Sequence, residues 1–289
     1  MVERLAWVTT RAARGRDDDE RIAVAALQRA GVAVDVVDWD DARVDWSRFD
    51  RVVPRSCWDY PERLTDFLAW ADRVATVSEL VNPPDIIRWS VDKQYLAELS
   101  AAGVPVTSTD FVPPGSAASF PTGDFVIKPS VGAGSRDAAW YGPAQHEEAR
   151  AHVTRLHECG AVALVQPHLK SVAAEGEWPI IFLGGEFSHA AGKQVSLPRA
   201  GVIDGLFAEE TNRPHTPSAD QRAVAEAAMA VVRQRLGAPP YGRVDLVRDD
   251  DGRFCVLEVE LVEPSLFLRY ADAVAMSRFV AAVGGKVRH

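Results

Sequence analysis

The acidic residues near the end of the chain have types and spacing that could do chemistry. Segment 244–267, VDLVRDDDGRFCVLEVELVEPSLF, holds two β-rich runs around Asp-Asp-Asp-Gly, which predicts a β-hairpin. Asp245 lies on the first arm, and Glu258 and Glu260 lie two residues apart on one face of the second. Carboxylates gathered in this way repel each other unless cations separate them, and Mg²⁺ with phosphates is the usual partner. The hairpin therefore predicts a Mg²⁺ site, with a solvated acidic face as the alternative.

A glycine-rich loop is the second candidate site. In segment 125–136, FVIKPSVGAGSR, an apolar strand ends at Lys128, and Gly132 and Gly134 follow between Ser130 and Ser135. Glycines let backbone N–H groups approach phosphate oxygens closely. The loop matches neither the Walker A pattern nor GxGxxG, so a glycine turn without a ligand is the alternative. A lysine at the strand end favours the phosphate-binding interpretation.

Two further cations lie at informative positions. Lys93 lies near the predicted start of a helix, where the helix dipole disfavours a positive charge. A role in holding phosphate would explain this position, and a solvated lysine is the alternative. Arg243 lies two residues before Asp245 and therefore on the same strand face. It is a candidate to stabilise phosphoryl charge, to pair with the neighbouring acids, or to do both.

Composition limits the class of protein. The chain has 289 residues and a net charge of −9, which argues against a general nucleic-acid binder because such proteins show a basic face. Its three cysteines show no CxxC spacing, which is typical of a reducing cytoplasm without structural zinc. The start resembles no signal peptide, and no apolar run is long enough for a membrane span. We therefore expect a cytoplasmic protein, either a monomer or a homodimer.

The pattern of elements predicts how these residues are positioned. Strands at 4–10, 32–39 and 49–56 alternate with helices at 17–30 and 61–75, which predicts a parallel α/β layer. Asn82-Pro83-Pro84 then marks a boundary. Beyond it we expect helices at 92–102, 143–158, 218–236 and 271–283, and strands at 104–112 and 163–169. We also expect a strand, loop and strand over 124–141, a hairpin at 177–193 turning at Gly184-Gly185, and the acidic hairpin.

These motifs together resemble a known family. Lys93, the Lys128 strand with its loop, and Asp245 with Glu258-x-Glu260 follow the order and approximate spacing of the ATP-grasp superfamily from about residue 85 onward. RSCWDY, NPPDIIRWSVDKQYL, GEWPIIFLGGEFSHAAGK and EVELVEPSLFLRY resemble its bacterial glutathione-synthetase-like branch, which includes D-cycloserine synthetase, an O-ureido-serine cyclo-ligase. The resemblance implies an α/β and α+β fold. It places an N-terminal pre-ATP-grasp domain at 1–85, subdomain A with the glycine-rich loop at 86–165, and subdomain B with the metal-binding hairpin at 166–289.

The resemblance also implies how ATP and Mg²⁺ bind between the two subdomains. Lys93 and Lys128 would hold the α- and β-phosphates, and the loop from Ser130 to Arg136 would close over the β- and γ-phosphates. The implied ATP-binding residues are Lys93, Lys128, Ser130, Gly132, Gly134, Ser135, Gln166, His168, Glu175 and Glu177, with adenine at 165–169 and the ribose near Glu175 or Glu177. Asp245, Glu258 and Glu260 would hold Mg²⁺. Many relatives have Glu-x-Asn where this chain has Glu-x-Glu, and a carboxylate still suits Mg²⁺.

The implied reaction is the joining of a carboxylate to an amine. A carboxylate oxygen attacks the γ-phosphoryl group to give an acyl phosphate and ADP, and an amine then displaces phosphate. Arg243 and Lys193 are the catalytic candidates, because cations neutralise the transferring group. Candidates for binding a small amino-acid-like carboxylate are Arg55, Trp58, Tyr60, Arg199, Glu263 and Ser265. Arg55 would suit the substrate carboxylate, whereas Trp58 and Tyr60 have interdomain packing as the alternative.

Four functions are compatible with this site. The preferred one is an ATP- and Mg²⁺-dependent ligase that closes a ring within one substrate. A ligase that joins two amino acids needs the same activation site, so the sequence does not separate the two. A small-molecule kinase and a nucleotide-binding regulator are the alternatives from other classes, and the presence of both lysines, Arg243 and the acids argues against a degenerate regulator.

Overall fold

The N-terminal part of the chain forms a parallel α/β layer in the computed structural model, which describes residues 3–199, 201, 208 and 210–285. Its strand order is β2-β1-β3-β4, and every pairing is parallel. The strands are β1 (Arg4–Thr9), β2 (Ala33–Asp38), β3 (Arg51–Ser56) and β4 (Glu79–Leu80), and the connecting helices are α1 (Asp18–Arg29) and α2 (Leu64–Ala75). The predicted strands and helices are confirmed here, and the short β4 was not predicted.

A central antiparallel sheet carries the acidic hairpin. Its order is β11-β10-β9-β12-β13, with β9 (Trp178–Leu183), β10 (Glu186–Val195), β11 (Glu210–His215), β12 (Tyr241–Arg248) and β13 (Phe254–Glu260). Both predicted hairpins are confirmed. The first turns at Gly184 and Gly185, which have φ angles of 62° and 80° that glycine adopts without steric cost. The second pairs β12 with β13 and sets the register of the candidate metal ligands.

A second antiparallel sheet carries the glycine-rich loop. Its order is β5-β8-β6-β7, with β5 (Asp110–Val112), β6 (Phe125–Pro129), β7 (Ala139–Tyr141) and β8 (Ala163–Pro167), and α5 (His146–Glu158) packs against it. The strand predicted over 104–112 is shorter than expected. Its first half instead runs beside the central sheet, where Val106 bridges to Val256 and the Thr107 N–H donates to the Val256 carbonyl at 2.9 Å.

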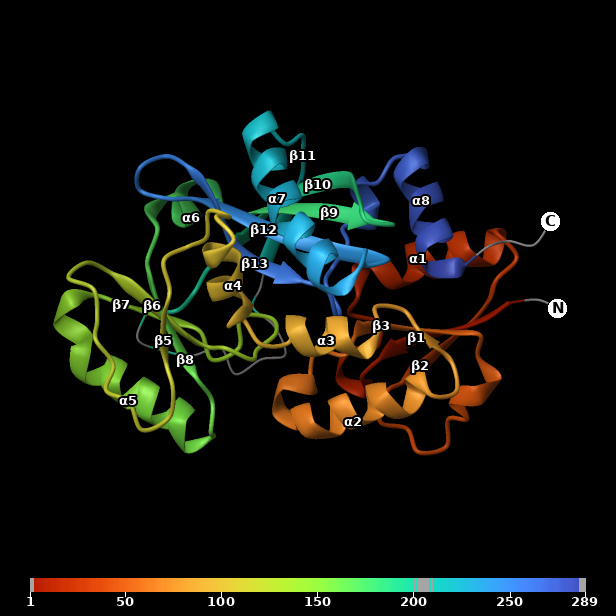
Figure 1. Ribbon diagram of the computed structural model, residues 1–289, viewed down its shortest axis with the longest axis horizontal. Coiled ribbons are helices and arrows are strands. Elements are labelled where there is room, and N and C mark those ends of the chain that lie inside the picture. Colours follow the sequence, from red (N-terminus) through yellow and green to blue (C-terminus); the bar gives the residue numbers. More distant parts are fainter. Residues whose placement is uncertain (1–2, 200, 202–207, 209, 286–289) are drawn as a thin grey trace.

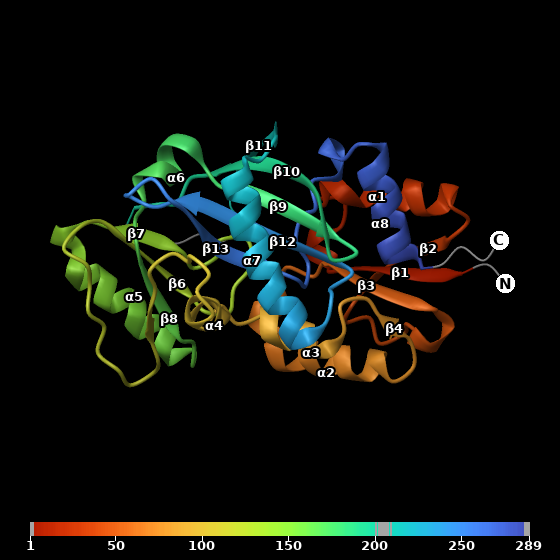
Figure 2. The same ribbon diagram turned by 45° about the horizontal axis from the view of Figure 1, so that its top comes forward.

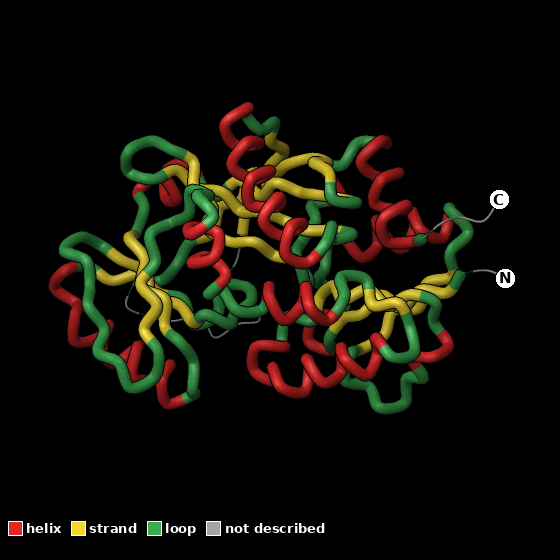
Figure 3. The backbone as a smooth tube through the Cα atoms, in the orientation of Figure 1, coloured by secondary structure: helices red, strands yellow, loops and turns green. Residues whose placement is uncertain are grey.

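Helices border the strands of all three sheets (Figure 3). α7 (Ala219–Leu236) crosses the central sheet in Figure 2, and its Ala225, Met229 and Val232 are buried against that sheet. Ser218 and Gln221 form a capping box that satisfies the first N–H groups of this helix. The remaining helices are α3 (Pro84–Ser90), α4 (Tyr95–Ala101), α6 (Lys170–Glu175) and α8 (Ala273–Gly284). None of the described helices has the length and apolar character needed to span a membrane.

The N-terminal layer and the central sheet share one core. Leu5 and Trp7 of β1 lie in the same buried cluster as Ile181 of β9, Tyr241 of β12 and Phe279 of α8. In Figure 1, α8, which lies near the C-terminal end of the chain, is beside α1. The N-terminal layer is therefore packed directly against the sheet that carries the acidic hairpin. The predicted domain boundaries at residues 85 and 165 stay predictions.

Asn82 fastens the predicted boundary segment to the central sheet. It is fully buried, has a φ of 60°, and donates through Nδ2 to the carbonyls of Tyr241 at 2.9 Å and Leu261 at 2.5 Å. Asparagine tolerates this left-handed conformation better than most residues do. One side chain thus satisfies two buried carbonyls on β12 and just beyond β13.

We predict that Asn82→Ala lowers the free energy of unfolding by about 3 kcal/mol, because two buried carbonyls lose their donor and alanine is strained at positive φ. Urea denaturation measures this loss, and the slope of the free energy of unfolding against urea concentration should be the same in the variant and the wild type. Asn212→Ala is the matched control, because among the described residues the Asn212 side chain donates to one group, the nearby Glu210 carboxylate. Equal stability losses in the two variants would contradict the prediction.

Candidate active site

A cleft of about 1090 Å³ lies where the three sheets meet. Sixteen of the predicted site residues line it: Trp58, Tyr60, Lys93, Lys128, Gly132, Gly134, Ser135, Gln166, His168, Glu177, Lys193, Arg243, Glu258, Glu260, Glu263 and Ser265. Five do not: Arg55, Ser130, Glu175, Arg199 and Asp245. The fold therefore brings most of the widely separated candidates to one place.

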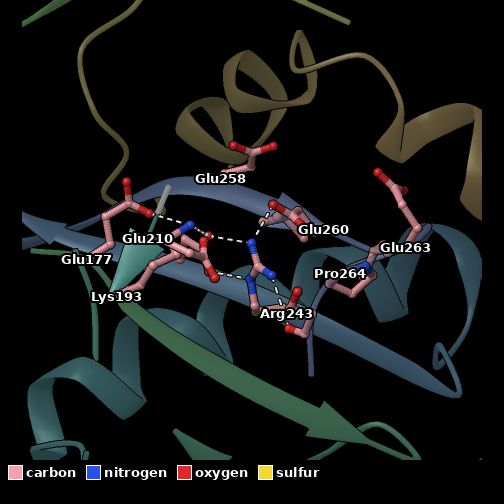
Figure 4. Close-up of polar contacts among 12 residues, drawn as sticks. Glu177, Lys193, Glu210, Arg243, Glu258, Glu260, Glu263 and Pro264 are labelled. Atoms are coloured by element: carbon pink, nitrogen blue, oxygen red, sulfur yellow. Dashed lines mark hydrogen bonds and ion pairs between the residues drawn. The ribbon is translucent and has the colours of Figure 1, made fainter. Parts of the chain in front are cut away.

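The register of the acidic hairpin builds an ion network on one sheet face. Arg243 lies opposite Glu260, and Asp245 lies opposite Glu258. The guanidinium of Arg243 contacts Asp245 with two hydrogen bonds, Nε to Oδ1 at 2.7 Å and Nη2 to Oδ2 at 2.8 Å, and it donates to Glu260 Oε1 at 2.5 Å. Lys193, on β10, donates to Asp245 Oδ2 at 3.0 Å, and its Nζ lies 2.6 Å from Glu177 (Figure 4).

Burial makes the charge balance of this network important. Burial alone would raise the pKa of Asp245, but Arg243 and Lys193 outweigh it and lower the pKa to about 2. Burial would lower the pKa of Arg243, yet Asp245 and Glu260 hold it well above its usual value. For Glu260 burial prevails over Arg243, and with the nearby Glu258 charge it raises the pKa to about 7. Asp245 and Arg243 are therefore charged at neutral pH.

The carboxylates that were predicted to need a metal ion are paired with cations of the protein itself. Lys93, Lys193 and Arg243 lie among the three carboxylates, so the protein's own cations offset their repulsion. Within the described part of the chain, no three His, Cys, Asp or Glu side chains are grouped so that they could hold a metal ion. Both oxygens of Asp245 are bonded to side-chain cations, and Asp245 does not line the cleft.

Glu258 and Glu260 nevertheless have the chemistry that Mg²⁺ prefers. Both line the cleft, and both form their ion pairs through Oε1. Mg²⁺ commonly takes one or two carboxylates and completes its shell with phosphate and water. These two residues fit such a partial ligand set.

Lys93 connects the glycine-rich loop to the acidic hairpin. Its Nζ donates to the Gly132 carbonyl at 2.8 Å and lies 3.0 Å from Glu258 Oε1, and its backbone N–H donates to the Ser130 carbonyl at 2.9 Å. Ser130 itself is buried below the loop and does not line the cleft. Arg136, at the end of the loop, pairs with Glu62 of the N-terminal layer. The loop thus lies across the cleft and contacts both neighbouring parts of the chain.

Lys128 carries a positive charge that none of the described residues balances by contact. It lines the cleft from β6, and within the described residues its ammonium makes no hydrogen bond or ion pair. Burial lowers its pKa, although Glu258 acts in the opposite direction. A buried cation without a partner is costly. An anion bound in the cleft would remove this cost.

The candidate adenine and ribose contacts separate into two groups. Gln166 and His168, at the end of β8, line the cleft, and Gln166 is oriented by a hydrogen bond from its Nε2 to Thr109 at 2.8 Å. Glu177 also lines it, whereas Glu175 is turned away and pairs with Arg248 at 3.4 Å. Of the two acids considered for the ribose, only Glu177 faces the cleft.

The candidate substrate contacts separate in the same way. Trp58, Tyr60, Glu263 and Ser265 line the cleft. Arg199 is exposed outside it and donates to Gln145 at 3.0 Å, while its guanidinium lies over the Trp140 ring. Arg55 lies within β3 rather than after it and is 2% exposed behind the cleft.

Sequence reasoning missed cleft residues contributed by the loop after β1 and the segment after β13. Arg16, Asp18, Asp19 and Arg269 line the cleft together with Glu263. Asp18 and Arg269 form an ion pair at 3.4 Å. Ligands of parallel sheets gather at the carboxyl ends of the strands. Applying that rule to β1 as well as to β3 would have selected Arg16 and Asp18, whereas no pattern in the sequence pointed to Arg269.

Comparison with known proteins decides the family. Residues 5–82 match the family described as the N-terminal domain of D-cycloserine synthetase DcsG. The cycloserine biosynthesis protein DcsG of Streptomyces lavendulae is 39% identical over an alignment of 297 residues. The alignment covers 98% of this chain and 99% of that protein. The chain belongs to the D-cycloserine synthetase family of ATP-grasp enzymes. Like that family, it is an ATP-dependent carboxylate–amine ligase, and the resemblance inferred from the motifs is confirmed.

Solved structures agree with the assignment. The crystal structure of D-cycloserine synthetase DcsG matches with a TM-score of 0.86 at 38% identity, over 96% of this chain and 98% of that one. The D-alanine–D-alanine ligase of Bacillus anthracis in complex with ATP matches with a TM-score of 0.68 at 14% identity, over 98% and 96%. The second likeness shows the shared ATP-grasp fold alone.

We predict that Lys128→Met raises the dissociation constant for ATP by at least about tenfold, because a cation–phosphate contact is lost. The melting temperature should stay equal or rise, because the variant no longer buries an ammonium without a partner. Calorimetry with ATP and thermal unfolding test the two statements. Lys170→Met is the control, because Lys170 is exposed on α6 and does not line the cleft. A lower melting temperature with unchanged ATP affinity would identify Lys128 as a structural residue instead.

Proposed function

We propose that this member of the D-cycloserine synthetase family uses ATP and Mg²⁺ to activate the carboxylate of a small amino acid and then closes a C–N bond within that molecule. One observation carries the proposal. The same cleft holds a cation, Lys128, and a carboxylate, Glu263, neither of which has a partner among the described residues. ATP would balance the first charge, and a substrate ammonium group would balance the second.

The phosphates of ATP would lie against Lys93, Lys128 and the glycine-rich loop. Gly134 and Ser135 have φ angles of 63° and 60°, and consecutive positive φ angles give the loop a sharp turn beside the cleft. In this structure Lys93 already contacts Glu258, so an incoming phosphate would compete for its ammonium. Glu258 and Glu260 would hold Mg²⁺, which neutralises phosphate charge when it is bound.

Arg243 is the residue best placed to act on the transferring group. It lines the cleft, and its bidentate pair with Asp245 fixes the plane of its guanidinium. A substrate carboxylate oxygen attacks the γ-phosphorus, the bond to the bridging oxygen breaks, and ADP leaves. A guanidinium held in advance stabilises the charge on the phosphoryl oxygens without reorganising. Lys193 is engaged by Glu177 and Asp245, so we assign it to holding these acids in place.

The second step forms the C–N bond. A nitrogen attacks the acyl carbon, and the bond between this carbon and the phosphate oxygen breaks. Inorganic phosphate leaves with the electron pair, and the nitrogen releases a proton. Ring closure requires that this nitrogen belongs to the same molecule, as in an O-ureido-serine. Family membership supports this choice, because the relatives at 38–39% identity bear the names D-cycloserine synthetase and cycloserine biosynthesis protein. Joining of two amino acids is the second candidate, supported by the fold shared with D-alanine–D-alanine ligase.

Glu263 is the proposed contact for the substrate ammonium group. It is 8% exposed, and burial, followed by the Glu260 charge, raises its pKa to about 8. Only the ionised carboxylate forms an ion pair with an ammonium group. Ionised Glu263 therefore suits amino acids over carboxylic acids without an amine.

We predict that kcat/KM for the amino acid falls about tenfold for each pH unit below about pH 8, because this parameter follows the protonation of the free enzyme. Glu263→Gln should remove this decrease at low pH. It should also lower kcat/KM by about thirtyfold or more, the cost of losing a buried charge pair. Steady-state kinetics at saturating ATP across pH measures both effects. Glu186→Gln, a change on an exposed residue of β10, should leave the profile as it is. A variant at position 263 that keeps the wild-type profile would rule out this role.

We predict that hydroxylamine added to enzyme, ATP and O-ureido-serine traps a hydroxamate, because the acyl phosphate forms before the amine attacks. Substrate labelled with ¹⁸O in its carboxylate should transfer label to inorganic phosphate. Mass spectrometry of the product then separates the candidates. Ring closure gives the mass of one substrate less the fragment lost, while intermolecular joining gives two substrates less water. A stable phosphorylated product without label transfer would indicate a kinase and overturn the proposal.

A further inference from the structure

The segment 261–268 brings Glu263 and Ser265 into the cleft without any regular secondary structure between β13 and its end at Leu268. A buried segment of this kind must find partners for its backbone groups elsewhere. Here side chains from other parts of the chain supply them for six successive carbonyls. Asn82 contacts the carbonyl of Leu261 at 2.5 Å, Tyr241 that of Val262 at 2.7 Å, Trp58 that of Glu263 at 3.3 Å, Arg55 that of Pro264 at 2.5 Å, Arg243 that of Ser265 at 3.1 Å, and His189 that of Leu266 at 2.8 Å.

Asp19 holds the strained part of this segment. Phe267 has φ 51° and ψ 41°, a left-handed conformation that is unfavourable for a residue with a large side chain. The N–H groups on either side of it both donate to Asp19, Leu266 to Oδ2 at 2.5 Å and Leu268 to Oδ1 at 2.8 Å. The two oxygens of one buried carboxylate therefore fix the backbone before and after Phe267.

Arg55 completes the arrangement from the neighbouring strand. Its guanidinium lies over the rings of Trp7 and Tyr241, at 5.4 and 5.1 Å from their centroids. Nη2 donates to the Pro264 carbonyl at 2.5 Å and lies 3.8 Å from Asp19 Oδ2. Its position behind the cleft corrects the expectation that it would touch the substrate carboxylate. Its charge offsets that of Asp19 and its donor holds the segment.

We propose that Asp19 and Arg55 are positioning residues that hold segment 263–268 in its binding conformation and so set the affinity for the amino-acid substrate. The proposal rests on the proposed function. Among the described residues, no hydrogen bond or ion pair joins Asp19 or Arg55 to the phosphate-binding side of the cleft, where Lys93 is held by Gly132 and Glu258 and Lys128 lies on β6. The affinity for ATP is therefore independent of the pair.

Asp19→Asn tests the proposal, because an amide has one acceptor oxygen and turns an N–H toward one of the two backbone donors. We expect the amino-acid KM to rise by at least about tenfold while the KM for ATP changes by less than about twofold. Hydrogen exchange at the Leu266 and Leu268 amides should accelerate by at least about tenfold, because these two bonds protect them. Asp272→Asn is the control, since Asp272 caps α8 with the same kind of bond and does not line the cleft.

Arg55→Lys is the second variant, and it tests the same proposal if Asp19→Asn does not fold. Lysine keeps the charge beside Asp19 but loses the planar contact with the two rings. We expect the same selective rise in the amino-acid KM, smaller than that of Asp19→Asn.

The outcomes separate this proposal from the proposed function. Wild-type enzyme that releases no ADP with any amino acid would overturn the proposed function. With an active wild type, unchanged exchange at Leu266 and Leu268 in both variants would overturn the positioning role. Faster exchange with an unchanged amino-acid KM, or equal rises in both KM values, would also overturn it.

Discussion

The buried pair between Arg243 and Asp245 is the interaction on which the active site depends. Both residues lie on β12, two apart, and the guanidinium contacts the carboxylate with two hydrogen bonds. Removing either partner would leave an uncompensated buried charge, which typically costs about 3–5 kcal/mol. Because Glu260 and Lys193 contact the same pair, its geometry also orients residues on β13 and β10. The pair fixes the guanidinium plane, and Nη1 of the same group donates to the Ser265 carbonyl at 3.1 Å.

Two charged residues in the cleft have no partner in the part of the chain that the structure describes, in contrast to this balanced network. Lys128 and Glu263 are desolvated by the surrounding residues, and burial shifts both of their pKa values toward the neutral form. Desolvation of this kind is a cost to the free protein that a ligand of opposite charge can offset. The arrangement matches a ligase that must bind an anionic nucleotide and an amino acid side by side.

The N-terminal layer contributes to the site mainly through support. Trp58, Tyr60 and Asp19 line the cleft, and Asp19, Arg55 and Asn82 bond to the backbone of segment 261–268. A segment without helix or strand bonds depends on such side chains for a single conformation. This dependence explains the position of Arg55. Its guanidinium lies over two aromatic rings near the substrate end of the cleft, and it does not line the cleft.

The sequence by itself determined the elements and the family, because strand alternation, turn residues and the order of the lysine and acidic motifs are local patterns. It predicted both hairpins and the parallel layer, and most of the candidate site residues that it indicated line the cleft. It did not determine the partners of the charged residues. Arg55, Ser130, Glu175, Arg199 and Asp245 all carried suitable chemistry, and the tertiary structure directs each of them away from the cleft. The orientation of Asp245 follows from the register between β12 and β13, and the position of Arg55 follows from the packing of β1 and β3 against β12. Contacts of the same kind join residues about 250 positions apart, as between Asp19 and Leu268. Such contacts depend on how the sheets pack together, and no local spacing records that.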